Sequence, residues 1–134
     1  MSVVFLSPFL RRVLVADALI SAAAGVLMGL GAGSLQDVLS LPSMLLRAAG
    51  LALLPWAAWL MWLARRPAVP AGAVWAVIIV NLMWVAESAW VAFGGSFQPN
   101  ALGQAFIVIQ AIAVAVIADF EFIGMRRSAP MLAA

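Results

Sequence analysis

The chain has 134 residues, of which 67% are apolar and 9% are charged, and its mean hydropathy is +1.17. Soluble globular domains are far less apolar, so this composition excludes water as the main solvent. The formal charge of +2 comes from arginines that lie mostly at the ends of apolar runs. That pattern is typical of membrane orientation, so we expect a lipid bilayer as the surroundings and no nucleic-acid partner.

Several residue types that carry chemistry are missing, since the sequence has no Cys, His, Lys or Tyr. Disulfides, Cys/His metal sites, histidine proton relays and lysine Schiff bases are therefore excluded. No pair of nucleophile and base can be assembled from the residues that are present. We predict a non-enzymatic protein with no metal and no cofactor.

Four apolar runs follow one another along the chain. Each is long enough to cross a hydrocarbon core of roughly 30 Å, which takes about 20 helical residues. We predict helices over about 13–33, 44–64, 71–93 and 102–124. Because no alternating β-barrel pattern is present, the expected fold is all-α. It is an integral membrane four-helix bundle that forms a single transmembrane domain, residues 1–134.

Arginine pairs predict the orientation of this bundle. Arg11-Arg12, Arg65-Arg66 and Arg126-Arg127 fall on one side of a four-span topology, whereas Arg47 alone falls near the other side. Cytoplasmic loops are enriched in Lys and Arg. We therefore expect both termini in the cytoplasm.

The first helix carries a stripe of small and polar residues. Asp17, Ser21, Gly25, Gly29 and Gly33 recur every four residues, so they lie on one side of the helix. Small residues at this spacing let another helix approach closely in lipid, which predicts a packing interface within the chain or with a second protomer. Asp17 either forms a salt bridge with a nearby arginine or is a carboxylate that binds a proton or cation.

Between the first two helices, residues 34–43 place Leu35, Val38, Leu39 and Leu41 at helix-like spacing. This spacing predicts a short amphipathic turn that rests in the membrane surface.

Three tryptophans lie deep in the predicted second and third helices, at Trp56, Trp59 and Trp84. They either pack in the core and against lipid, or line a cavity for a flat or cationic ligand.

Matched depth in antiparallel helices predicts two polar pairs. Arg47 and Glu87 are near the same side of the membrane, where each would neutralise the other. Asn81 and Gln110 are near the midplane, where a pair of side-chain amides would join the third and fourth helices. Glu87 is also a candidate proton- or ligand-binding residue, because a carboxylate is costly at that depth.

Two more acidic residues lie near the end of the fourth helix. Asp119 has a depth similar to that of Asp17, so the two are candidates for a shared polar cluster. Glu121 is closer to the end of the helix, and we expect it to reach the lipid headgroups.

Two runs, Ser7-Pro-Phe-Leu-Arg-Arg-Val-Leu-Val-Ala-Asp-Ala18 and Leu41-Pro-Ser-Met-Leu-Leu-Arg-Ala-Ala-Gly50, carry a likeness to known proteins. The chain resembles a family of small four-span bacterial inner-membrane proteins without assigned function. The resemblance covers nearly the whole chain. It implies a bacterial inner (cell) membrane and no activity.

Two classes of function stay open at this point. The first is a non-enzymatic protein that acts through helix association, as a homo-oligomer or as a subunit of a larger membrane complex; the glycine stripe favours it. The second is a homodimeric, proton-coupled small-molecule transporter, which Asp17, Glu87 and the deep tryptophans favour. A wet cavity that reaches either carboxylate would support the second class.

Overall fold

The computed structural model describes residues 2–128. In this part of the chain four long helices, α1 (Pro8–Leu30), α3 (Ser43–Ala64), α4 (Ala71–Phe93) and α5 (Ala101–Arg127), are long and apolar enough to cross a membrane. A short helix α2 (Ala32–Leu39) and two short strands, β1 (Val3–Phe5) and β2 (Ala68–Pro70), complete the fold. The helical prediction with four spans is confirmed, and it indicates a multi-pass membrane protein. Residue 1 and residues 129–134 of the predicted domain lie outside the described residues.

Local sequence explains where the first helix begins and ends. Ser7 accepts a hydrogen bond from the backbone N–H of Leu10 at 3.1 Å, and Pro8 occupies the first turn. α1 therefore begins before the predicted residue 13. It ends at Gly31, and α2 follows directly. α2 supplies the predicted helical turn after the first span, although Leu39 and Leu41 are buried in the bundle instead of lying on a membrane surface.

An antiparallel ribbon joins the chain's first residues to the segment between α3 and α4, and the sequence patterns did not predict it. Val4 of β1 pairs with Val69 of β2, and Val69 is buried in the core. The side chain of Arg11 donates to the backbone carbonyl of Ala64 nearby. At the same end of the molecule, the Ser7 N–H donates to Oγ of Ser128 at 3.1 Å. These contacts fix the ends of all four long helices relative to one another.

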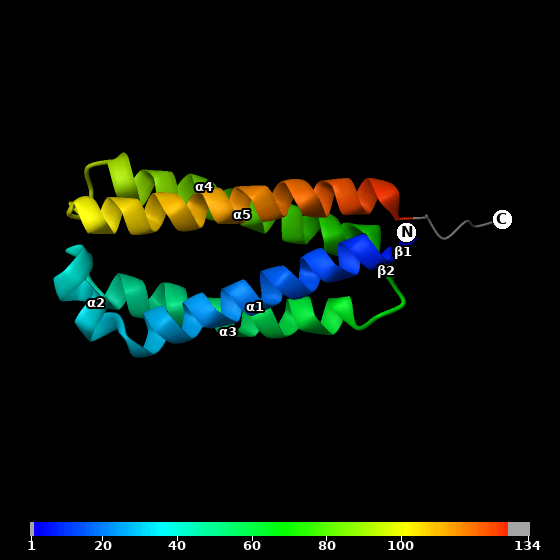
Figure 1. Cartoon of the computed structure of the whole chain (residues 1–134), viewed down its shortest axis with the longest axis horizontal. Helices are drawn as coiled ribbons and strands as arrows, with labels where there is room; N and C mark the ends of the chain where they lie inside the picture. The colour runs from blue at the N-terminus through cyan, green and yellow to red at the C-terminus, as the bar shows by residue number, and fades with distance from the viewer. Residues whose placement is uncertain (1, 129–134) are drawn as a thin grey trace.

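The helices form two layers, which Figure 1 shows one above the other. α1 packs along α3 in one layer and α4 packs along α5 in the other, while α1 also contacts α5. β1 and β2 lie at one end of the bundle, and α2 lies at the opposite end. Apolar core residues fill the end near the strands, among them Leu10, Leu14, Leu60, Val74 and Val77.

The glycines of α1 are used for packing inside the chain. A Cβ atom on Gly25 would lie 2.9 Å from the carbonyl oxygen of Gly50 on α3, and one on Gly50 would collide with the backbone of Gly29. The two helix backbones thus approach too closely for any side chain at these positions. The partner helix that the sequence left open is therefore α3 of the same chain.

Gly33 does not belong to this interface, so the prediction was wrong at the end of the stripe. It lies on α2, is exposed, and a Cβ atom there would meet nothing within 4 Å. The reason is the break at Gly31, which ends α1 and changes the direction of the chain before Gly33.

Candidate functional site

A buried polar cluster joins three helices at the centre of the bundle. The Nδ2 atom of Asn81, on α4, donates to Oδ2 of Asp17 on α1 at 2.8 Å and to Oε1 of Glu121 on α5 at 2.9 Å. The exposed fractions of the three side chains are 4%, 2% and 0%. One amide therefore holds two carboxylates in surroundings that are otherwise apolar.

The two carboxylates of this cluster are not equally satisfied. Asp17 also accepts a hydrogen bond from the hydroxyl of Ser21 at 3.2 Å, so both of its oxygens have donors. Within residues 2–128, Glu121 accepts from Asn81 alone, and its Oε2 atom is buried without a hydrogen-bond partner. Buried polar atoms nearly always have a partner, so Oε2 is the acceptor in this cluster that is left unsatisfied by the protein.

The salt bridge considered for Asp17 does not form. Its hydrogen bonds come from Ser21 and Asn81. Arg11 turns to the Ala64 carbonyl instead, and Arg12 is exposed. Among the described residues, the donors to the two carboxylates are therefore the neutral side chains of Ser21 and Asn81.

Glu121 takes the place that the sequence assigned to Asp119. Asp119 is exposed on the outer side of α5, whereas Glu121 is fully buried, so the expectation that Glu121 reaches the headgroups was wrong. Side chains on a helix point toward its N-terminus, and this brings the Glu121 carboxylate deeper than its backbone. A signal was present: Gly124 and Ser128 follow Glu121 at spacings of three and seven, which marks one packed side of the helix.

The predicted amide pair of Asn81 with Gln110 is also wrong. Gln110 accepts from the indole Nε1 of Trp84 at 2.7 Å and donates to the hydroxyl of Ser88 at 2.9 Å. Both partners lie on α4 beyond Asn81. The register of α4 against α5 places Asn81 at the height of Glu121, so Gln110 is offset from Asn81 toward the other end of the helix pair.

Arg47 and Glu87 do not pair, although their depths match. A cavity of about 110 Å³ is lined by Glu87 and by Leu45, Leu46 and Ala49 of α3, so this part of α3 does lie at the height of Glu87. Arg47 itself is exposed on the outer side of the helix. Consecutive helical residues point about 100° apart, and the depth argument ignored this rotation.

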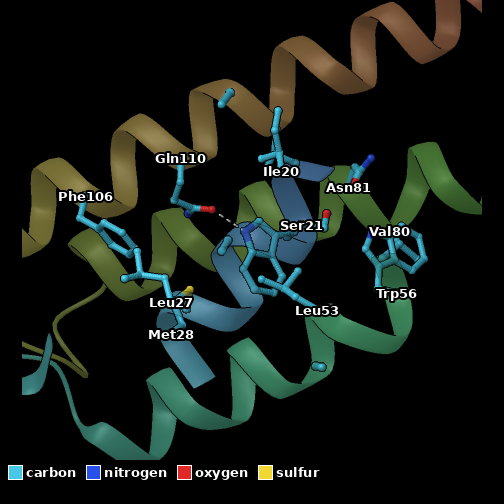
Figure 2. A pocket seen from close by; sticks show the side chains of 15 residues that line it. Ile20, Ser21, Leu27, Met28, Leu53, Trp56, Val80, Asn81, Phe106 and Gln110 are labelled. Atoms are coloured by element: carbon cyan, nitrogen blue, oxygen red, sulfur yellow. Dashed lines mark hydrogen bonds between the residues drawn. The ribbon is translucent and has the colours of Figure 1, made fainter. Parts of the chain in front are cut away.

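A cavity of about 250 Å³ lies between the two layers. Figure 2 shows that its walls come from four helices: Ser21 on α1, Trp56 on α3, Asn81 on α4 and Gln110 on α5. The other lining residues are apolar, including Met28 and Phe106. Asn81 therefore faces the cavity and the two carboxylates at once.

Two of the three deep tryptophans line this cavity. Trp56 and Trp84 belong to its wall, and the hydrogen bond from Trp84 to Gln110, dashed in Figure 2, fixes the orientation of the indole. Trp59 does not line it and packs against Trp56 instead, with ring centres 5.4 Å apart.

No family model, curated protein or solved structure matches this chain.

The site combines two buried carboxylates, which can change their charge, with a cavity that can hold a small molecule. The cavity has the apolar walls and few polar groups of a small-molecule site, and Asn81 connects it to Asp17 and Glu121. A change of charge at the carboxylates alters the hydrogen bonds of a residue in the cavity wall. The arrangement can thus link the binding of a cation at the cluster to the binding of a molecule in the cavity.

Proposed function

We propose that this chain is a proton-coupled carrier of small amphipathic molecules. The observation that supports the proposal best is the position of Asn81, which lines the cavity while it donates to both Asp17 and Glu121. Buried ionisable residues in membrane helices are costly, and they mark ion or proton pathways more often than packing contacts.

A proton is the cation that fits the cluster most simply. Two carboxylates in an apolar interior repel each other strongly, so one of them holds a proton unless another cation is bound. Glu121 Oε2 is the free acceptor position, whereas both oxygens of Asp17 have donors. In this proposal, Glu121 is the carboxyl group that holds the proton in the resting state.

The charged residues of the neighbouring segments leave this assignment in place. On α1, Arg11 is bound to the Ala64 carbonyl. On α5, Arg126 lies over the Phe122 ring and Arg127 over the Phe9 ring, at 5.7 Å and 5.0 Å from the ring centres. These groups lie near the helix ends, where they remain available to water and lipid headgroups.

Coupling in this proposal passes through Asn81. When Glu121 loses its proton, its carboxylate attracts the Asn81 amide more strongly, and the bond to Asp17 weakens in return. The cavity wall changes with it, because the same side chain borders the bound molecule. The affinity for the carried molecule and the affinity for the proton are then linked in both directions.

The glycine stripe no longer favours the alternative function, in which the chain acts through helix association. Gly25 and Gly29 face Gly50 within the chain, so this stripe offers no free surface to a second protomer. We place the carrier in a bacterial inner membrane with both termini in the cytoplasm. The arginine distribution supports this orientation.

The proposal is tested in proteoliposomes with an imposed pH gradient and a panel of cationic, neutral and anionic aromatic probes. Wild-type protein should show probe-dependent proton flux. Asp17→Asn and Glu121→Gln should abolish the flux, while Asp119→Asn, which changes an exposed carboxylate of α5, should preserve it. Flux that is the same in all variants, or that follows a sodium gradient instead of a proton gradient, would contradict the proposal.

A further inference from the structure

A second cavity of about 110 Å³ adjoins the first. Four residues line both cavities: Met28, Trp84, Phe106 and Gln110. The larger cavity ends at Ser21 and Asn81, next to the buried cluster, and the smaller one is bordered by Glu87. A molecule bound at their junction would therefore have the cluster on one side and Glu87 on the other.

Glu87 is separate from the hydrogen-bonded cluster. Arg47, which the sequence suggested as its partner, is exposed on α3. Glu87 is exposed, and it borders the smaller cavity together with Trp84, Ser88 and apolar side chains. A carboxylate at the border of a cavity attracts a cation that enters it.

Within the described residues, neither cavity is lined by a positively charged side chain. No arginine is among their lining residues, and the sequence has no Lys or His. The nearby charges are Glu87 and the negative charge that the Asp17–Glu121 pair keeps when it holds one proton. The electrostatic field in both cavities therefore favours a cation.

The walls also suit the body of an organic cation. Trp56, Trp84 and Phe106 present aromatic surfaces, on which ammonium groups bind through cation–π attraction. The remaining wall is almost entirely apolar, which favours alkyl or aromatic substituents over a hydrated metal ion.

We propose that the carried molecule is an amphipathic organic monocation, an ammonium ion with aromatic or alkyl groups, and that Glu87 recognises its charge. The inference rests on the proposed carrier function and gives Glu87 a role that differs from that of the cluster. Glu87 selects the charge of the cargo, whereas Asp17 and Glu121 exchange the proton.

The test compares two probes of nearly equal shape, phenyltrimethylammonium and its uncharged isostere tert-butylbenzene. Equilibrium dialysis against nanodiscs with and without the protein separates binding from partition into lipid. Wild-type protein should bind the cation about tenfold more tightly than the isostere. Glu87→Gln should bring the two affinities close together, and the matched control Asp119→Asn should keep the wild-type ratio.

Equal affinities in wild type, tighter binding of the isostere, or an unchanged ratio in Glu87→Gln would overturn this inference. The wild-type ratio shows whether the cavities prefer a cation, even if Glu87→Gln does not fold. Binding is measured without any proton gradient, so it is independent of the flux assay. Flux that shows no preference for cationic probes would overturn the proposed class of cargo and leave the carrier function standing. Cation binding that depends on Glu87 but is not accompanied by flux would overturn the carrier function.

Discussion

The side-chain nitrogen of Asn81 lies 2.9 Å from Oε1 of Glu121, across the interface between α4 and α5. The same nitrogen donates to Asp17, so one amide connects three helices inside the bundle. A donor that serves two buried carboxylates contributes to stability as well as to chemistry, because its removal leaves both acceptors unsatisfied.

Replacing Asn81 by Leu should therefore lower the free energy of unfolding by about 3 kcal/mol, the value expected for hydrogen bonds to buried charged groups. In a Glu121→Gln background the loss should be smaller by about 1 kcal/mol, since one of the two carboxyl acceptors is then absent. Reversible unfolding in mixed detergent micelles measures both values. The Asp119→Asn background is the control and should show no coupling; additive losses with Glu121→Gln would rule out the shared amide.

Gly50 should tolerate no side chain. A Cβ atom there would collide with the backbone of Gly29 and lie 2.9 Å from the Gly25 carbonyl. Gly50→Ala should lower the free energy of unfolding by about 1–3 kcal/mol, as expected for overpacking. Gly33→Ala is the matched control, because its Cβ atom would meet nothing within 4 Å. Thermal unfolding in detergent compares the two, and equal stability of both variants would contradict the close approach of α1 and α3.

Arg47 and Glu87 should act independently. Arg47 is exposed on α3 and Glu87 borders the smaller cavity. In a double-mutant cycle with Arg47→Ala and Glu87→Ala, the coupling energy should stay below about 0.5 kcal/mol, the usual limit for independent sites. A larger coupling would restore the ion pair that matched depth suggested.

Reporter fusions test the orientation. Fusions after Arg66 and after Arg127 should report a cytoplasmic location, because the paired arginines favour that side. A fusion within residues 94–100 should report a periplasmic one. A cytoplasmic signal from residues 94–100 would reverse the bundle in the membrane, and Glu87 would then lie on the cytoplasmic side.

The four spans could be predicted from the sequence because hydropathy and length alone determine them. Asp17 could be selected as well, since a carboxylate within an apolar run is costly wherever it points. These inferences need only the composition along the chain and the thickness of a bilayer. They do not depend on how the helices rotate about their axes.

The partners of these residues could not be predicted in the same way, because depth says nothing about rotation. Arg47 lies at the height of Glu87 but on the outer side of α3. Gln110 is offset from Asn81 along the helix pair by the register of α4 and α5, and so bonds to Trp84. β1 and β2 have three residues each, and such short strands leave no periodic pattern in the sequence.

The most direct test of the central claim is infrared spectroscopy of the carboxyl groups in reconstituted protein at neutral pH. A protonated carboxyl group has a C=O stretching band that an ionised one lacks. Wild-type protein should show such a band, with a component that is lost in Glu121→Gln and kept in Asp119→Asn and Glu87→Gln. A Glu121→Gln spectrum identical to that of wild type in this region would show that Glu121 holds no proton, and would contradict proton coupling at the Asp17–Asn81–Glu121 cluster.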